Sequence, residues 1–400
     1  MRCNTTQVAA LLNDTVKEDL GLSSVINEDL SNCVDFGHEV FDVSEANMDN
    51  FCKKLISRIG RTIFVNRTYE GNTLALYRSS FEYGSILQKI TLNSLPESTP
   101  DESWLLEDNT SYDPFVFKKP DVSEKFFDLH EAFDIEFSVT DEQIKSAFLD
   151  ANALGAFVSM LWDGVDKSMS LKLEELATRT VTSFVAKTMD ASFPLVVDND
   201  YSGMTSVRAI NLLYEYNTQF GLTGTDALTK DNCLFSAEFI KFATQRIDLT
   251  LSRLTKLSTL FNIGAKPRFT PKAAQHVIAL SNFKSASDIY LNSSVYNKEL
   301  TSLPNGITEV PYWQGSGTGY ALSSVGNIHC TIKKGDSTKE ISVSHVLAVA
   351  FDHDACGVYQ ERKETNSMYN PKARFTNYFA HYMAGTFADE NENFVVFYVA

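Results

Sequence analysis

The sequence predicts an α+β protein, because helical and strand patterns both occur in it and occupy different stretches of the chain. Apolar residues recur every three or four positions over 144–162, 173–185 and 240–261, which is the spacing of one helix face. Apolar and polar residues alternate over 133–139, and the run 394–399 is wholly apolar, as in strands. A chain of 400 residues is long enough for two or three domains.

Bulk composition excludes several classes of protein. Apolar residues make up 44% of the chain, enough for a sizeable core, and the net charge is −16. A surface that coats nucleic acid needs Lys and Arg to contact phosphates, so this charge argues against one, although it is compatible with a shell that encloses nucleic acid without gripping it. The N-terminus lacks the apolar stretch of a signal peptide, and no run approaches the roughly 18 apolar residues of a membrane span, so we expect no membrane association.

The six cysteines are scattered through the chain, and no two have the Cys-x-x-Cys spacing of a structural zinc site. They are Cys3, Cys33, Cys52, Cys233, Cys330 and Cys356. In a chain of this length, such a distribution indicates free thiols in a reducing compartment.

The first part of the chain predicts an arm followed by a small helix and strand. Residues 1–44 contain eight acidic and two basic residues and only short apolar clusters, which is too little for a domain of their own. We expect this arm to pack on other parts of the protein or on a neighbour, the alternative being a partly disordered tail. A helix is expected at 47–59 and a strand at 61–76.

Residues 84–139 differ from the rest. A strand is expected at 86–92 and a second strand-like run over 126–139, whose alternation is strict from 133, with a proline-rich segment between them. The segment contains 12 acidic and four basic residues and four aromatic residues that a hairpin alone does not cover: Trp104, Tyr112, Phe115 and Phe117. A long hairpin needs a further surface to bury such residues. That surface is either another subunit or, if the segment is a flap, the core of the same chain.

Two helices are expected in the middle of the chain, at 141–162 and 170–189, with a turn at Trp162–Asp166 between them. Thr140-Asp141-Glu142-Gln143 has the spacing of a capping box, which marks the start of the first helix. Ser170 is the expected N-cap of the second helix.

The second half of the chain begins with a turn-rich break at 190–203, which indicates a domain boundary. Helices are then expected at 206–220, 236–261 and 286–300, a loop at 301–319, a hairpin at 328–341, and strands at 276–280, 343–351 and 394–399. Because a buried strand at a chain end usually lies inside a sheet, we expect 394–399 in such a position.

One cluster suggests chemistry. Asp352, His353 and Cys356 follow a predicted strand and are all residue types that bind metals, so a metal-dependent hydrolase is one hypothesis. No second pair of ligands has suitable spacing, and His329, Cys330 and His345 would join only through tertiary proximity. A polar turn at the end of a strand is the simpler interpretation.

Other patterns carry no chemistry. Gly315–Gly319 lacks both nucleotide-binding glycine patterns, no Gly-x-Ser-x-Gly is present, and Glu174 and Glu175 would lie in the first turn of a helix, where its dipole accounts for them. We therefore predict no catalytic residue, no metal site and no cofactor, and hence a protein that is not an enzyme.

The order of these elements, and three stretches of sequence, resemble a known family over about residues 45–400. The stretches are Arg78–Ile90, Pro304–Gly315 and Tyr369–Tyr378. They are similar to segments of the major capsid proteins of tailed bacteriophages, which have the Johnson fold, and closest to those of small short-tailed phages.

The resemblance implies a division into domains. It implies an N-terminal arm (1–44), an extended two-stranded loop (84–139), a peripheral domain with a long spine helix (45–83, 140–200 and 341–400) and an axial domain (201–340). It also implies that the loop lies across a neighbouring subunit, which would account for its uncovered aromatic residues.

The function implied is that of a structural subunit of an icosahedral capsid, which assembles with itself into hexamers and pentamers and encloses the DNA genome. The arm is short for a cleaved scaffolding segment, which implies a separate scaffolding protein, besides the portal protein and at most weak contact with DNA. The implied location is the virion, and the host cytoplasm before assembly. Lys118 or Lys119 would be available for a covalent cross-link, but no motif requires one. An encapsulin-like compartment is the alternative within the same fold.

Overall fold

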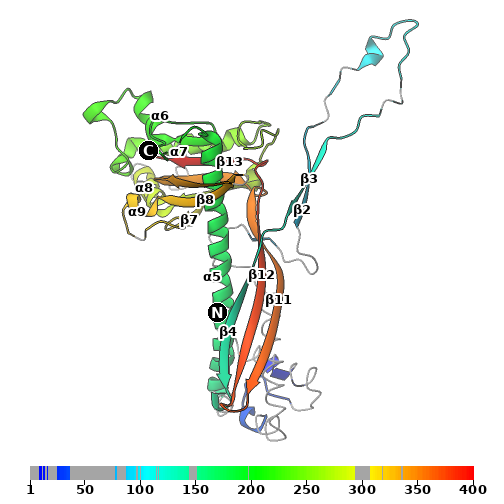
Figure 1. Cartoon of the computed structure of the whole chain (residues 1–400), viewed down its shortest axis with the longest axis vertical. Helices are drawn as coiled ribbons and strands as arrows, with labels where there is room; N and C mark the ends of the chain where they lie inside the picture. The colour runs from blue at the N-terminus through cyan, green and yellow to red at the C-terminus, as the bar shows by residue number, and fades with distance from the viewer. Residues whose placement is uncertain are drawn as a thin grey trace.

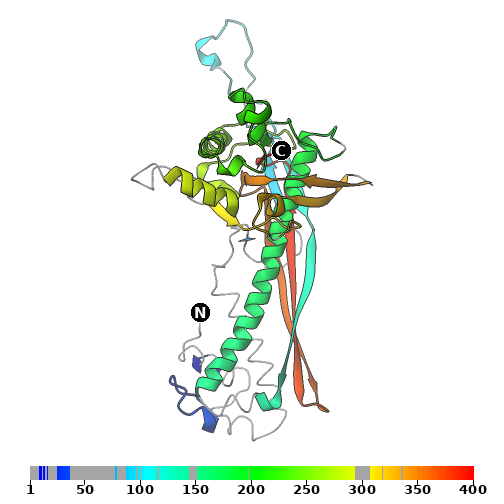
Figure 2. The same ribbon diagram turned by 90° about the vertical axis from the view of Figure 1, so that its left-hand side faces the viewer.

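The computed structural model describes most of the chain after residue 86 and short pieces before it. The described residues are 9–10, 12–13, 16, 25–36, 77–78, 87–95, 98–99, 101–113, 115, 117–143, 151–196, 198–292, 307–317, 319–334 and 337–400. The predicted helix at 47–59 and the predicted strand at 61–76 lie outside them. The molecule is elongated, with a body at one end, a long helix and a narrow sheet that run down from it, and a thin projecting loop (Figures 1 and 2).

A single helix, α5 (Ala151–Ser192), runs from the lower end of the molecule into the body. It contains 42 residues, which corresponds to about 63 Å. The predicted turn at 162–166 is therefore wrong, and Ser170 lies inside the helix rather than at its N-cap. The buried side chains of Val165 and Met169 continue the apolar stripe through this region, and this packing outweighs the modest cost of Gly164 in a helix.

The predicted stripe of the second half of α5 is confirmed. Its apolar members are all buried: Leu173, Leu176, Ala177, Val181, Phe184 and Val185. The predicted capping box is also present, because the Thr140 N–H donates to Gln143 Oε1 at 3.0 Å and the Gln143 N–H donates to Thr140 Oγ1 at 3.3 Å.

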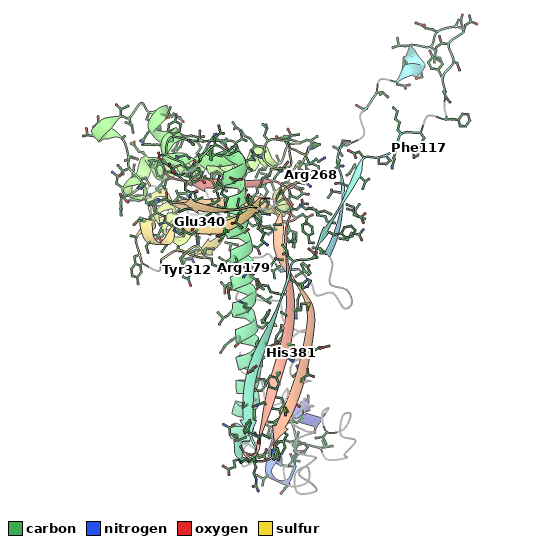
Figure 3. The ribbon with its side chains drawn as sticks, in the orientation of Figure 1. Phe117, Arg179, Arg268, Tyr312, Glu340 and His381 are labelled. Atoms are coloured by element: carbon green, nitrogen blue, oxygen red, sulfur yellow. The ribbon has the colours of Figure 1, made fainter. Side chains whose placement is uncertain are left out.

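A narrow four-stranded sheet lies along α5. Its order is β1 (Tyr77–Arg78), β11 (Cys356–Asn370), β12 (Phe375–Ala388) and β4 (His130–Thr140). The alternation predicted over 133–139 is confirmed, since every second side chain of β4 turns to the buried face. On that face, Phe137 stacks on Tyr378 at 5.2 Å between ring centroids. Arg179 of α5 and Glu131 of β4 form an ion pair that ties the helix to the sheet (Figure 3).

A five-stranded sheet forms the centre of the body. Its order is β5 (Ala209–Asn211), β13 (Phe394–Tyr398), β10 (Val346–Asp352), β6 (Gln275–Leu280) and β7 (Ile307–Val310). Alternate residues of β13 pack on opposite sides, with Val396 in the core around α5 and Phe397 in the core around α7. Burial on both faces explains why these strands are continuous apolar runs. The prediction that 394–399 lies inside a sheet is confirmed.

Helices cover the face of this sheet opposite α5. They are α6 (Leu212–Gln219), α7 (Ala237–Leu254) and α8 (Ser281–Asn292), with the single turn α9 (Leu322–Val325) nearby. The prediction of a helix at 206–220 is partly wrong, because β5 precedes α6 and Asn211 caps the helix by accepting a hydrogen bond from the Tyr214 N–H at 3.1 Å. The helix predicted at 236–261 ends at Leu254, and the Phe261 side chain is buried from the loop that follows.

Two further predictions need correction at their boundaries. Helix α8 begins at Ser281 rather than 286, and its expected continuation over 293–300 lies outside the described residues. The loop predicted at 301–319 contains β7, which pairs parallel with β6. The hairpin at 328–341 is confirmed as β8 (Ile328–Lys334) and β9 (Ser337–Val343), which packs on α5 through Ile328 and Ile341.

The projecting loop begins as a two-stranded ribbon of β2 (Leu87–Leu92) and β3 (Val122–Phe127), which confirms the strand expected at 86–92. The returning strand expected up to residue 139 is divided, because only its start lies in β3 and the rest forms β4 in the sheet along α5. In the described part of the chain, no helix has both the length and the apolar character needed to cross a membrane.

Candidate functional site

The segment between β2 and β3, residues 93–121, is here called the loop tip. It extends well away from the body, as the label of Phe117 shows (Figure 3). The side chains of Trp104, Phe115 and Phe117 are 87%, 88% and 84% exposed, so nothing in the described part of the chain covers them. Leu105 and Leu106 are exposed beside Trp104. Large apolar side chains grouped in this way mark a surface that binds another molecule.

The loop tip is shaped by local hydrogen bonds. Asp101 accepts one from the Ser103 N–H and Asp113 accepts one from the Phe115 N–H, both at 2.9 Å. The Glu107 N–H donates to the Tyr112 hydroxyl at 3.1 Å. The bond from Ser103 keeps the pKa of Asp101 below its ordinary value. These contacts form turns along the segment and leave its apolar side chains directed outward.

The ribbon is fastened to the body by ion pairs with two buried carboxylates, in a region here called the root (Lys89, Lys125, Arg268, Asp389 and Glu392). Lys89 of β2 and Lys125 of β3 are cross-strand neighbours. The Lys89 ammonium lies 2.8 Å from Asp389 Oδ2 and 2.9 Å from Glu392 Oε1, and Lys125 Nζ lies 3.2 Å from Asp389 Oδ1. Arg268 Nε lies 3.4 Å from Glu392 Oε1, and its Nη1 donates to the Leu92 carbonyl at 2.7 Å.

The pKa values of the two carboxylates of the root are shifted in opposite directions. Burial raises the pKa of Asp389, but the hydrogen bond and charge of Lys89 and the charge of Lys125 outweigh it, so the pKa lies below its ordinary value. Burial also raises the pKa of Glu392, and there the attraction of Lys89 and Arg268 does not fully offset it. Lys89 therefore stabilises Asp389 as the principal anion of the root.

Apolar packing completes the root. Phe127 of β3 packs on Tyr359 and Phe387, and its ring centroid lies 5.8 Å from that of Phe387. The Tyr359 hydroxyl donates to the Phe127 carbonyl at 3.3 Å. Gly385 permits this arrangement, since a Cβ there would lie 2.1 Å from Tyr359 Cζ. The loop thus has a fixed base and an uncovered tip.

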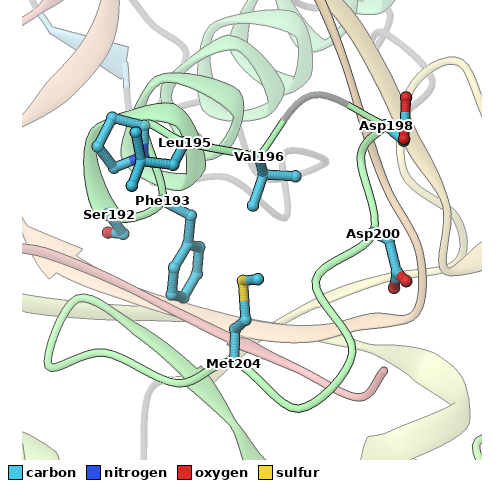
Figure 4. Close-up of a pocket in the computed structure, with 8 residues that line it drawn as sticks. Ser192, Phe193, Leu195, Val196, Asp198, Asp200 and Met204 are labelled. Atoms are coloured by element: carbon cyan, nitrogen blue, oxygen red, sulfur yellow. The ribbon is translucent and has the colours of Figure 1, made fainter.

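A pocket of about 420 Å³ lies where the chain leaves α5 (Figure 4). Its lining is Ser192, Phe193, Pro194, Leu195, Val196, Asp198, Asp200 and Met204. Lys339 holds this segment in place by binding Asp190 at 2.7 Å and the Val196 carbonyl at 3.2 Å. Hydrogen bonds from the Ser202 hydroxyl and N–H keep the pKa of Asp200 below its ordinary value, so the rim of the pocket is anionic.

The residues considered for metal chemistry do not form a site. Asp352–Ala355 make the turn between β10 and β11, and the Cys356 thiol is fully buried, which raises its pKa. His353 Nδ1 lies 3.0 Å from His276 Nε2. Within the residues that the structure describes, no group of three or more His, Cys, Asp and Glu side chains is arranged to hold a metal ion.

The remaining candidates are dispersed. His329 and Cys330 lie on β8, while His345 lies between β9 and β10, where burial lowers its pKa. Glu174 and Glu175 are in the middle of α5, and Glu175 binds Lys172 at 2.9 Å, so the helix dipole does not account for them. Gly317 and Gly319 lie beside Ser324, and Gly315 lies beside the His329 carbonyl, all at the protein surface.

Sequence reasoning missed the root. Lys89 and Asp389 are 300 positions apart, and neither belongs to a motif. The signal available was the polar run Asp389–Asn393 between two apolar strands, which indicates a turn but not its partner.

Comparison with known proteins identifies the family. No curated protein sequence matches significantly. The capsid structure of Staphylococcus phage Andhra contains a similar chain, with 11% identity over 84% of this chain and 87% of that one and a TM-score of 0.49. The capsid of cyanophage P-SCSP1u gives 9% identity, 84% and 93% coverage and a TM-score of 0.41. The family model described as Phi29-like phage major capsid protein matches residues 10–398. The chain therefore belongs to this family and is a structural capsid subunit with the tailed-phage major capsid fold.

Proposed function

We propose that the subunit assembles with itself into the hexamers and pentamers of an icosahedral shell that encloses a DNA genome. The observation that supports this most is the loop tip, whose aromatic side chains are exposed while the root is fixed. Exposed apolar surface of this kind is stabilised when a second molecule covers it. Because each copy would both present a tip and receive one, many modest interfaces add to a stable shell.

In this proposal, the extended loop predicted at 84–139 crosses onto a neighbouring subunit, assisted by the arm 1–44. Only its projecting part, from β2 to β3, would make that crossing, because β4 belongs to the sheet along α5. Residues 45–83, 140–200 and 341–400 form the peripheral domain, and 201–340 form the axial domain. Strands β10 and β13 pair with β6 and β5, so the boundary at 340 does not coincide with a boundary between sheets. The C-terminal segment would thus contribute to both domains.

The same proposal includes a scaffolding protein during assembly, a portal protein at one vertex and at most weak contact with DNA. The net charge of −16 supports the last point, because an acidic wall repels phosphates. The subunit would pass from the host cytoplasm into the virion, and its role would be structural and not catalytic.

Deletion of 95–125 tests the proposal. The variant should fold, because Lys89, Arg268, Asp389 and Glu392 of the root lie outside the deletion and only Lys125 is lost. A companion deletion of 95–121, closed by a short Gly/Ser linker to residue 122, keeps Lys125 and the whole of β3. Both should yield soluble subunits and no shells in negative-stain images. A variant in which 98–119 is replaced by a Gly/Ser linker of equal length separates the loss of side chains from the loss of length. Shells at the wild-type yield from any of these variants would show that the loop does not join subunits.

A further inference from the structure

We propose that the loop tip of one copy docks on the segment 253–272 of a second copy, here called the basic turn. The inference rests on the proposed function and names the surface that receives the tip. It starts from the distribution of charge along the chain. Residues 249–287 contain six Lys and Arg and no Asp or Glu, in a protein with a net charge of −16. The loop tip contains seven acidic residues and two lysines.

The basic turn is closed by backbone hydrogen bonds. Ser258 and Arg268 exchange two of them, at 2.9 and 3.0 Å, and the Thr270 N–H donates to the Leu254 carbonyl at 2.8 Å. In this antiparallel bridge the residues next to Ser258 and Arg268, Leu257 and Phe269, are cross-strand neighbours on one face.

That face is apolar and uncovered. The side chains of Leu257 and Phe269 are 53% and 51% exposed, and that of Leu260, elsewhere in the same turn, is 59% exposed. They provide apolar surface of the kind that Trp104, Phe115 and Phe117 of the tip also present. Contact between the two surfaces would remove both from water.

The charges of the basic turn are available to a partner. Arg268 is engaged by Glu392 and by the Leu92 carbonyl of its own chain. Arg253, Lys256 and Lys272 are exposed, and none of them forms an ion pair with a residue that the structure describes. Complementary potentials of this kind steer association and fix which surfaces meet.

The tip that binds must come from a second copy. Arg268 places the basic turn beside the root of its own loop, whereas Phe117 lies well out along that loop, beyond the ribbon (Figure 3). Each copy therefore gives its tip to one neighbour and receives another on its basic turn. Such a head-to-tail contact repeats from copy to copy and closes into a ring when the rotation permits.

The pocket beside Leu195 is the weaker acceptor. It is apolar and of a suitable size for an aromatic ring, but Asp198 and Asp200 line its rim. The acidic residues of the tip would be repelled by this rim, although Lys118 and Lys119 would be attracted to it. The charge of the whole tip favours the basic turn.

Charge reversal tests the pairing. The tip variant is Glu107→Lys with Asp108→Lys, since both carboxylates are exposed and neither accepts a hydrogen bond within the described residues, unlike Asp101 and Asp113. The turn variant is Lys256→Glu with Lys272→Glu. A third protein combines all four changes. A matched control, Lys230→Glu with Lys241→Glu, reverses two exposed lysines outside the basic turn.

Particle yield is measured by sedimentation and negative stain, with the same phage proteins supplied to each variant, and circular dichroism checks the fold of unassembled subunits. We expect the tip and turn variants each to lower the yield about ten-fold or more, because like charges then meet at the interface. The combined variant should recover most of the yield, and the control should match the wild type.

Other outcomes overturn the proposal. Normal yields from both single-surface variants, or a combined variant no better than either, would show that these surfaces do not meet. A turn variant that assembles normally but encloses less DNA would assign the basic turn to nucleic acid. If deletion of 95–125 blocks assembly while the reversals do not, the loop still joins subunits and only this acceptor is wrong.

Discussion

The five-stranded sheet and the loop tip differ in the burial of their aromatic side chains and in the hydrogen bonds that hold their backbones. In the sheet, β10 and β13 are buried on both faces, and Phe394 packs on Phe184 of α5 with 4.3 Å between ring centroids. In the tip, aromatic residues of the same size are exposed and only short turns shape the backbone. The difference indicates that the sheet stabilises the single subunit, whereas the tip contributes stability only after another subunit covers it.

The largest expected effect compares one phenylalanine from each region. Phe397→Ala should lower the free energy of unfolding of the subunit by about 3–5 kcal/mol, because it leaves a cavity in the centre of the sheet. Phe117→Ala should change it by no more than about 0.5 kcal/mol and should instead reduce assembly. Denaturant unfolding of unassembled subunits, with particle yields alongside, would measure both. Similar stability losses from the two variants would break the comparison.

The root joins the two regions and should behave as part of the body. Lys89→Met leaves Asp389 and Glu392 buried without their main cation, so we expect a loss of about 3 kcal/mol in unfolding free energy. Lys172→Met removes an ion pair at the surface of α5 and should cost less than about 1 kcal/mol. Equal effects would mean that the root charges are solvated in the unassembled subunit.

Gly385→Ala tests how tightly the root is packed. The added methyl group would lie 2.1 Å from Tyr359 Cζ, and Tyr359 is fully buried, so the ring has no free space to enter. Overpacking of this kind should cost about 1–3 kcal/mol in unfolding free energy. An unchanged stability would show that the base of the loop yields as easily as its tip.

Gly164→Ala tests whether α5 is continuous through residues 162–166, where the sequence predicted a turn. The position is helical and exposed, and a Cβ there meets nothing within 4 Å. Alanine should raise the unfolding free energy by about 0.5–1 kcal/mol, because it loses less conformational freedom than glycine. A loss of stability would indicate the turn that the sequence first suggested at this point.

The smallest effect concerns pH and the pair His276 and His353. Burial, followed by the charge of His353, holds the pKa of His276 below its ordinary value of 6.5. The unfolded chain therefore binds a proton first as pH falls below about 6.5, and the subunit loses stability until pH drops below the pKa of the folded state. Above that window both states are neutral and the contribution is flat. His276→Gln should lose less melting temperature than the wild type between pH 7 and pH 5, because this titration is removed. An equal loss of melting temperature in the two proteins would contradict this prediction.

Sequence periodicity predicted what depends on local pattern. The stripe of α7, the capping box at Thr140 and the buried strand β13 all follow from spacing within a few residues. The continuity of α5 was not predictable in this way, because Trp162–Asp166 contains both glycine and aspartate, which favour turns. The helix is supported by packing on distant elements such as β11 and β12, which no local pattern reveals. The root was hidden for the same reason, since it pairs charges from opposite ends of the chain.

The exposed tip was the one functional feature that sequence reasoning found. Acidic and proline-rich surroundings showed that Trp104, Phe115 and Phe117 had no partner nearby in the sequence, and the structure confirms their exposure. The surface proposed to receive it could not be predicted, because Lys256 and Lys272 belong to no motif and only the fold brings Leu257 and Phe269 together beside them.

Hydrogen exchange over residues 93–121, compared between unassembled subunits and assembled particles, tests the central claim most directly. The amides of β13 serve as the internal reference and should exchange slowly in both states, since that strand is buried in each subunit. We predict that the amides of the loop tip exchange rapidly in the subunit and become protected in particles. Equally rapid exchange of the tip in both states would contradict the claim that a second copy covers it.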